Sequence, residues 1–446
     1  MAVEYTNRDH ASREPTPTER LLSLWDHLGL RAAHVATQMS GDVADLARTH
    51  PERIAGLLLC VPSRLDPAPF ARVAARMVML SGERGMTADV TARAESRLPG
   101  ARRLVLPAYD APGWADIVTD RTAGIVAALR GLTGEATTPA PQLGNGLHAG
   151  ITYRVHGAGP ALVLLPFFLA PSQWEPAIPE LARHFTVIVL GGRHLGGVAA
   201  LEDRARGPSY AGMIGNLFDV IAPRAGETIL DVGCGSGALD RMLARRFGDA
   251  NPITATDLNP FLLREAAALA AEDGLSDRIA FREGNAERLP FPDASFGHAF
   301  TVTVLEECDA DLALRELWRV VRPGGRVGVI VRAIDLPQWW NLDLPETIRR
   351  KVDVPPQSNG PRGVADASLY RRMAAAGFAE LTCFPALVTF DRPDGPIWRY
   401  REDHALAQLD EAETATWHAA TAAARAAGLL FMANPLHRAV GKKPGA

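Results

Sequence analysis

The segment 228–237 has the residue types of a ligand-binding turn. An apolar run ends at Asp231, and glycines follow at every second position, at Gly233, Gly235 and Gly237. Glycine lets the backbone turn sharply and lets a ligand approach closely, and a helix that starts after such a turn presents N–H groups without helical partners. The loop can hold a nucleotide or a nucleoside, but its spacing also fits the loose dinucleotide pattern or a purely structural turn.

A second acid narrows the class of ligand. Asp257 ends the next apolar run, where a carboxylate can accept hydrogen bonds from both hydroxyls of a ribose. Two more segments follow in order: Gly284–Phe296 comes after the third expected strand, and Val321–Gly325 precedes the fifth. The acid alone fits a dinucleotide as well as a single nucleoside, so the choice between these two ligands depends on the ordered set of four segments.

Together the four segments resemble the class I S-adenosylmethionine-dependent methyltransferases, and among them the ubiquinone/menaquinone C-methyltransferases. The resemblance extends over about half of the chain, from Ser209 to Pro444. It implies S-adenosyl-L-methionine as the cofactor and a small-molecule acceptor, methylated at carbon, oxygen or nitrogen, with a secondary metabolite as one candidate. It also implies a Rossmann-like sheet of seven strands whose last strand runs antiparallel.

The resemblance places the methionine and ribose ends of the cofactor. Gly233, Gly235 and Gly237 would lie under the methionine part, and Asp231 would orient the loop and the amino group of the cofactor. Asp257 would bind the ribose hydroxyls.

The same resemblance places the adenine and the methyl group. Leu258 would pack on the adenine ring, and Asn285, Ala286 and Glu287 correspond to the segment that contacts the adenine edge. The family often has Asp where this chain has Asn285. Thr303 would line the methyl side of the pocket.

Methyl transfer requires alignment of a nucleophile with the methyl group, and it requires a base only if the acceptor must lose a proton. Glu306 and Glu307 follow the fourth expected strand and are candidate catalytic acids; the alternative is a solvated helix start. Trp339, Trp340 and Tyr370 are candidate substrate-pocket residues; the alternative is that they pack an insertion and a helix.

The first part of the chain resembles a different fold. Residues 20–133, with LARTHPERIAGLLLCVP at 46–62, resemble the C-terminal half of an α/β-hydrolase, and residues 151–200, with ITYRVHGAGPALVLLPFF, resemble its N-terminal half. The halves are in reversed order, and the Gly-, Pro- and Thr-rich segment 134–150 joins them as a linker. Because each half alone would expose strand edges, we expect a circularly permuted domain with one composite sheet.

The catalytic residues of a hydrolase are missing from this part. The nucleophile elbow G-x-S-x-G should fall within Ala36–Gly41 and is not present there. Arg84 or Gly85 stands at the usual acid position, Asp110 at the usual histidine position, and Pro166–Phe168 replaces the oxyanion segment. We therefore expect no hydrolysis, and a role in structure, in a dimer surface or in a wall of the substrate cleft.

These residues require elements that hold them at one edge of a sheet. Apolar runs alternate with amphipathic stretches in both parts, which predicts an α/β fold of two domains, 1–205 and 206–446. Each domain should have a mostly parallel sheet with helices on both faces. In such sheets ligands bind at the carboxyl ends of the strands, where the glycine loop and Asp257 are expected.

Composition excludes several other classes of protein. The chain has 446 residues, 47 basic and 51 acidic, and its net charge of −4 predicts no nucleic-acid partner. No apolar run approaches the roughly 20 residues that span a bilayer, and four scattered cysteines predict neither disulfides nor a metal site. We expect a cytoplasmic enzyme and consider a homodimer. The alternatives are cyclisation or elimination with the same cofactor, a non-catalytic cofactor-binding scaffold, and a residual esterase.

Overall fold

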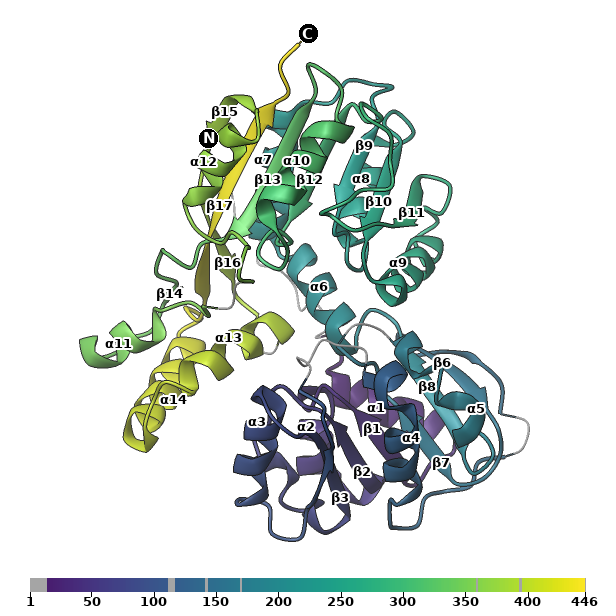
Figure 1. Ribbon diagram of the computed structural model, residues 1–446. Coiled ribbons are helices and arrows are strands. Elements are labelled where there is room, and N and C mark those ends of the chain that lie inside the picture. Colours follow the sequence, from purple (N-terminus) through teal and green to yellow (C-terminus); the bar gives the residue numbers. More distant parts are fainter. Residues whose placement is uncertain are drawn as a thin grey trace, which may run out of the picture. The chain divides into compact units, whose positions relative to one another are not determined.

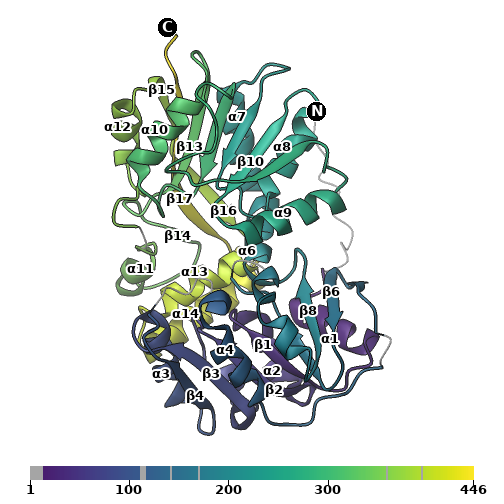
Figure 2. The ribbon, with the colours of Figure 1, turned by 45° about the vertical axis from the view of Figure 1, so that its right-hand side comes forward.

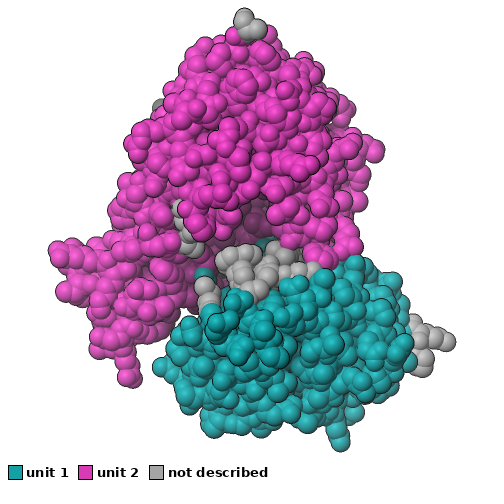
Figure 3. Space-filling model, in the orientation of Figure 1, with its two compact units in different colours: residues 1–198 teal, residues 199–446 magenta. Residues whose placement is uncertain are grey.

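The computed structural model describes residues 14–110, 117–140, 143–168, 171–357, 360–392 and 395–445. The chain forms two compact units, Met1–Val198 and Ala199–Ala446, which Figure 3 distinguishes by colour. The structure thus divides the chain at 198/199, whereas the sequence suggested 205/206. Helix α6 (Gly196–Arg206) contains this division, and from Ala199 onward its residues belong to unit 2.

Unit 1 alternates strands and helices, as its hydrophobic pattern predicted. Its helices are α1 Pro17–His27, α2 Gly41–Thr49, α3 Met86–Glu95, α4 Ile117–Arg130 and α5 Ile178–Leu181. Its strands are β1 Ala33–Thr37, β2 Ile54–Cys60, β3 Met77–Gly82, β4 Arg102–Leu106, β5 Gly146–His148, β6 Ile151–His156, β7 Ala161–Leu164 and β8 Thr186–Gly191.

The two segments of unit 1 form one eight-stranded sheet in the order β4-β3-β2-β1-β7-β8-β6-β5. β1 pairs in parallel with β2 on one side and with β7 on the other, so strands from before and after the linker meet at the centre. β6 runs antiparallel to both β8 and β5. The composite sheet is as expected, but the linker is shorter than 134–150 because β5 lies within that range.

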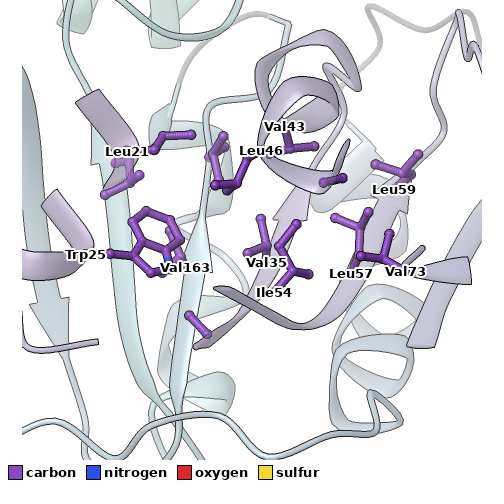
Figure 4. Close-up of a cluster of buried hydrophobic side chains, with 14 of the residues drawn as sticks. Leu21, Trp25, Val35, Val43, Leu46, Ile54, Leu57, Leu59, Val73 and Val163 are labelled. Atoms are coloured by element: carbon purple, nitrogen blue, oxygen red, sulfur yellow. The ribbon is translucent and has the colours of Figure 1, made fainter. Parts of the chain in front are cut away.

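Alternate residues of the unit 1 strands pack on opposite faces of the sheet. Val35 and Leu57 point to the face covered by α1 and α2, where Trp25 is buried (Figure 4). Ala36 and Leu58 belong to the other cluster, under α4 and α5. A parallel sheet needs helices on both faces because its strands are apolar on both sides.

Unit 2 also alternates strands and helices (Figures 1 and 2). Its helices after α6 are α7 Pro208–Ile221, α8 Ala238–Phe247, α9 Pro260–Glu272, α10 Ala310–Val320, α11 Glu346–Val352, α12 Ser368–Ala375, α13 Pro396–Leu406 and α14 Glu411–Ala426. Its strands are β9 Ile229–Val232, β10 Ile253–Asp257, β11 Ile279–Glu283, β12 His298–Val302, β13 Arg326–Arg332, β14 Trp339–Trp340, β15 Ala379–Cys383, β16 Ala386–Phe390 and β17 Met432–Lys442.

The unit 2 sheet has the order β11-β10-β9-β12-β13-β17, with the first five strands parallel and β17 antiparallel to β13. The antiparallel last strand was predicted. In the part of unit 2 that the structure describes, the sheet has nine strands and not seven, because β15 and β16 pair in succession with β17 and the two-residue β14 also pairs with it. The β17 strand is long enough to accept all of these partners.

Two helical layers cover the unit 2 sheet. Phe300 and Ile330 pack with α7 and α8 on one face, whereas Ala299 and Val329 pack with α10 and α12 on the other. A further small core, centred on Trp340, joins α11, α13 and α14. Within the described residues, no helix is both long and apolar enough to span a bilayer.

Candidate cofactor site

The glycine loop follows the buried strand β9 and needs glycine at its first position. Gly233 has φ +84°, and a Cβ added there would lie 2.2 Å from Cγ2 of Val304. The backbone N–H groups of Gly233 and Cys234 donate to the carbonyl of Thr256, at 2.7 and 2.8 Å, which ties the loop to β10. Gly237, with φ +68°, precedes α8. The turn therefore brings backbone close to the carboxyl edge of the sheet, where a side chain would not fit.

Asp257 ends β10 beside this loop. Its carboxylate accepts hydrogen bonds from the N–H of Gly235 and the N–H of Asn259, both at 2.9 Å. Burial raises the pKa of Asp257, against the effect of these backbone donors. The next residue, Leu258, is 63% exposed, which is unusual for a leucine beside a buried strand. A fixed acid next to an exposed apolar side chain suits a ribose and a flat ring.

Asp231 and Asp240 form a buried acidic pair under the loop. Asp231 is 2% exposed at the end of β9, and Asp240 is fully buried in the first turn of α8. Burial raises the pKa of Asp231 well above its usual range, and the negative charge of Asp240 adds to the rise. Burial raises the pKa of Asp240 to about 7. The pair therefore holds a proton near neutral pH.

Helix α6 is tied to the glycine loop by buried ionic contacts that the sequence did not indicate. Glu202 accepts hydrogen bonds from Oγ of Ser236 and from Nη2 of Arg241, both at 2.6 Å. Arg241 also pairs with Asp273, at 2.9 Å. The side chain of Leu201 lies 3.0 Å from where a Cβ on Gly235 would stand. Together these contacts hold α6 against the loop.

The end of β12 closes another side of the site. Thr303 follows β12 with φ +56°, and its Oγ1 accepts a hydrogen bond from Nη1 of Arg204, at 3.2 Å. The Arg204 guanidinium lies over the ring of Tyr210, at 5.1 Å from its centroid. Neither Arg204 nor Tyr210 was among the predicted site residues, because no motif distinguishes them from other residues of α6 and α7.

Glu306 and Glu307 have different surroundings. Glu306 is fully buried, and its Oε1 accepts a hydrogen bond from the N–H of Arg332, at 2.7 Å. Its Oε2 is buried without a hydrogen-bond partner among the described residues. Burial raises the pKa of Glu306 to about 7, opposed by the positive charge of Arg332. Glu307 is exposed and pairs with Nη2 of Arg332, at 2.7 Å. Of these two glutamates, only Glu306 has a buried carboxylate oxygen without a hydrogen-bond partner among the described residues.

The segment after β11 contacts Asp257 through its backbone. The N–H of Gly284 donates to the carbonyl of Asp257, at 3.0 Å. Asn285 is exposed, and its Oδ1 accepts from the N–H of Glu287, at 2.8 Å. Oε1 of Glu287 accepts from the N–H of Asp309 at the start of α10, at 2.7 Å. Ala286 is half-buried, so this segment follows the same sheet edge as Asp257.

The three candidate pocket residues are not equivalent. Trp340 is fully buried between Trp398 and Trp417, and its Nε1 donates to the carbonyl of Val352, at 3.1 Å. The prediction that Trp340 lines a pocket is therefore wrong, because its ring is fully buried in the hydrophobic core of the insertion. Trp339 is 46% exposed.

Tyr370 contacts a histidine on the face of the sheet opposite α7. Its hydroxyl lies 2.9 Å from Nδ1 of His437, whose Nε2 lies 2.8 Å from Asp335. Tyr370 packs against the cluster formed with α10 and α12, whereas Tyr210 belongs to the cluster with α7 and α8. The structure therefore does not bring Tyr370 together with Tyr210.

In unit 1 the residues at the positions where the sequence resemblance would place a hydrolase site make hydrogen bonds or ion pairs within the protein. Oε1 of Gln38, directly after β1, accepts a hydrogen bond from the N–H of Phe168, at 2.9 Å. The hydroxyl of Ser40 donates to a backbone carbonyl at 3.0 Å. Arg84 and Asp110 are both exposed and lie 3.8 Å apart. Across the described residues of both units, no cluster of His, Cys, Asp and Glu could hold a metal ion.

Known proteins match mainly the segment that carries the site. Residues 229–325 match the family model described as a methyltransferase domain. The ubiquinone/menaquinone biosynthesis C-methyltransferase UbiE of Hahella chejuensis is 39% identical over 114 residues, which cover 25% of this chain and 46% of that protein. The same enzyme of Legionella pneumophila (strain Paris) is 36% identical over 109 residues, covering 24% and 43%. The chain thus spans less than half of the curated relatives it matches.

Solved structures also match about half of the chain. The [4+2]-cyclase SpnF has 26% identity and a TM-score of 0.35, over 53% of this chain and 82% of that one. A geranyl diphosphate methyltransferase in complex with SAM has 19% identity and a TM-score of 0.33, over 52% and 85%. The family match confirms the predicted resemblance for the strands that hold the glycine loop and Asp257: residues 229–325 are similar to a methyltransferase domain.

Proposed function

We propose that the protein transfers a methyl group from S-adenosyl-L-methionine to a small-molecule acceptor. The observation that carries the proposal is that the segment matching a methyltransferase domain contains a turn in which one position accepts only glycine. At Gly233 a Cβ would collide with Val304, and Asp257 stands beside that turn. The two C-methyltransferases named above support the same activity.

The described residues fit this cofactor. Asp257 would accept hydrogen bonds from the ribose hydroxyls, and the exposed Leu258 would cover one face of the adenine. The glycine turn would lie under the methionine part, and Asp231, at the end of β9, would orient the loop and the amino group of the cofactor. When bound, S-adenosyl-L-methionine supplies an activated methyl group, so the protein contributes mainly alignment.

Glu306 is the residue of this chain best placed to hold a proton near the acceptor. It lies past the end of β12, at the carboxyl edge of the sheet, with Oε2 buried and unpartnered among the described residues. Because its pKa is raised to about 7, it can accept a proton near neutral pH from an acceptor that must lose one. Glu307, which is exposed, would only hold Arg332 in place.

Calorimetry and product identification test this function. Purified full-length protein should bind S-adenosylhomocysteine and S-adenosylmethionine, and incubation with acceptor candidates should yield S-adenosylhomocysteine, measured by mass spectrometry. Formation of methylthioadenosine in its place would indicate elimination or cyclisation. Binding without turnover of any acceptor would favour a scaffold, and absence of binding would overturn the proposal.

For unit 1 we propose a circularly permuted α/β-hydrolase-like domain without hydrolytic activity. The strand order of its sheet and the reversed order of its two segments support the permutation, and Gln38 at the turn after β1 supports the loss of activity. A chromogenic ester should not be hydrolysed; measurable turnover would contradict this. A homodimer and a cytoplasmic location stay predictions from the sequence.

A further inference from the structure

A hollow lies at the amino ends of the unit 2 strands, at the edge of the sheet opposite the glycine loop. β9, β12 and β13 run in parallel and begin there, whereas the glycine loop follows the last residue of β9. The hollow has a volume of about 510 Å³, within the range of roughly 300–1,000 Å³ that is typical of small-molecule sites. Its wall includes four basic residues, Arg224, Arg322, Arg326 and Lys442. The proposed cofactor site uses none of them.

The four basic side chains come from different segments that the sheet brings together. Arg224 lies between α7 and β9, Arg322 lies between α10 and β13, and Arg326 begins β13. Lys442 ends β17 and is the antiparallel partner of Arg326. Side chains that are directly opposite in such a pair lie on the same face of the sheet, and like charges at these positions repel each other. The sheet therefore concentrates positive charge at this edge.

Carboxylates of the protein neutralise this charge only in part. Nζ of Lys442 pairs with Glu380, at 2.8 Å. Glu227 also lines the hollow, where its Oε2 accepts a hydrogen bond from the N–H of Arg224, at 2.6 Å, and lies 2.9 Å from Nε2 of His298. These two contacts lower the pKa of Glu227, so its carboxylate is ionised near neutral pH. The hollow and Glu380 together thus carry four positive and two negative charges.

The three guanidinium groups at the hollow have only neutral partners. No carboxylate of the described residues lies within 4.0 Å of the guanidinium of Arg224, Arg322 or Arg326. Nη1 of Arg326 donates to the carbonyl of Ile221 at 3.1 Å, and Nε of Arg322 donates to the carbonyl of Ala294 at 3.4 Å. Each guanidinium has five N–H donors, so donors are left for an anion. This positive region is exceptional in a chain whose net charge is −4.

We propose that this edge of unit 2 binds a small polyanion, a molecule with at least two phosphate or carboxylate groups. Guanidinium groups bind both kinds of group through paired N–H donors, and cations on separate segments suit more than one anionic group. Binding would also relieve the repulsion between Arg326 and Lys442. The inference does not rest on the proposed function, because the hollow and the glycine loop lie at opposite ends of β9.

Calorimetric titration of the full-length protein with inorganic pyrophosphate and with citrate tests this site. Acetate, which has a single carboxylate, is the comparison ligand. We expect at least one of the two polyanions to bind, equally well with and without saturating S-adenosylhomocysteine, and acetate to bind at least about tenfold more weakly. Tighter binding of pyrophosphate would identify the ligand groups as phosphates, and tighter binding of citrate would identify them as carboxylates.

Two arginine variants locate the site on the protein. Arg322→Gln removes an exposed guanidinium and should weaken binding of the polyanion by about 3- to 10-fold. Arg326→Gln removes a half-buried one and should weaken it by about tenfold or more. Arg315→Gln is the matched control, because it removes an exposed arginine of α10 that does not line the hollow, and it should leave the affinity unchanged.

Three results would overturn the inference. The first is binding of neither polyanion, or binding of acetate with equal affinity. The second is an unchanged affinity for the polyanion in both Arg322→Gln and Arg326→Gln. The third is loss of polyanion binding when S-adenosylhomocysteine is added, which would place the anion at the glycine loop. The affinity for S-adenosylhomocysteine itself is a separate measurement, so failure of the polyanion site and failure of the proposed function are distinguishable.

Discussion

The turn after β1 in unit 1 and the turn after β9 in unit 2 both follow a parallel strand, but they differ in whether their polar groups are hydrogen-bonded within the protein. Each turn follows a buried parallel strand and leads into a helix. In unit 1, Gln38 accepts a hydrogen bond from Phe168, and Asp42 accepts one from the N–H of Gly196, at 2.9 Å. In unit 2, the glycines leave the backbone bare, and nearby Oη of Tyr210 and Oε2 of Glu306 have no partner among the described residues.

The backbone of the two turns differs as well. Gly233, Gly235 and Gly237 all have positive φ, whereas no residue of the described turn Thr37–Gly41 does. A hydrolase nucleophile sits on a strained turn of the kind that unit 1 lacks. Buried polar groups that satisfy one another have no need of a ligand, so the comparison agrees with the proposal of a cofactor site at the turn after β9 and no hydrolase site at the turn after β1.

The largest difference between the two turns is expected when one glycine in each is replaced by alanine. Gly233→Ala places a Cβ 2.2 Å from Val304 at φ +84°, so we expect a loss of about 2–4 kcal/mol of unfolding free energy and loss of S-adenosylhomocysteine binding. Gly41→Ala meets nothing within 4 Å and should be nearly neutral. Urea unfolding and calorimetry measure both; equal effects would contradict the comparison.

Removal of the acid after β10 should weaken the cofactor site specifically. Asp257→Ala should reduce the affinity for S-adenosylhomocysteine by about 1–3 kcal/mol, through loss of a charge-assisted hydrogen bond. Calorimetry that shows unchanged affinity for S-adenosylhomocysteine would count against the ribose role of Asp257.

The buried pair Asp231–Asp240 should make unit 2 sensitive to pH. The pKa of Asp240 is raised from 3.8 to about 7 in the folded protein. The unfolded chain therefore releases its proton at lower pH, and the free energy of unfolding falls as pH rises through this window. Asp240→Asn, which cannot ionise, should be more stable than the unmodified protein by about 1–2 kcal/mol at pH 8. Urea unfolding at about pH 5 and pH 8 measures the difference; an identical pH dependence in both proteins would show that the pair does not share a proton.

The smallest effect is expected in unit 1. Gln38→Ala leaves the N–H of Phe168 without this partly buried acceptor and should cost about 1 kcal/mol of stability. Because Gln38 belongs to the other unit, the affinity for S-adenosylhomocysteine should not change. Thermal unfolding and calorimetry test the two statements separately, and a change in affinity would show that unit 1 contributes to the cofactor site.

The regular elements and the backbone site were predictable from local pattern. Apolar strand ends, the alternating glycines and Asp257 are close in sequence, so the turn and its acid were identified before the sheet was known. Arg204, Tyr210 and Glu202 were not identified, because a single arginine, tyrosine or glutamate in an amphipathic helix has no distinguishing spacing. Asp240 could have been identified as unusual, since it is an acidic residue among the buried positions of α8.

The sequence by itself determined the alternation of strands and helices and the glycine-dependent turn, because these depend on residues within a few positions of one another. Only the tertiary structure decided that Trp340 is enclosed by Trp398 and Trp417 and that one oxygen of Glu306 has no hydrogen-bond partner among the residues that the structure describes. Those outcomes depend on contacts between distant segments, such as β14 with β17 and β12 with β13. Burial and hydrogen-bond pairing are properties of such contacts, so residue type and spacing cannot specify them.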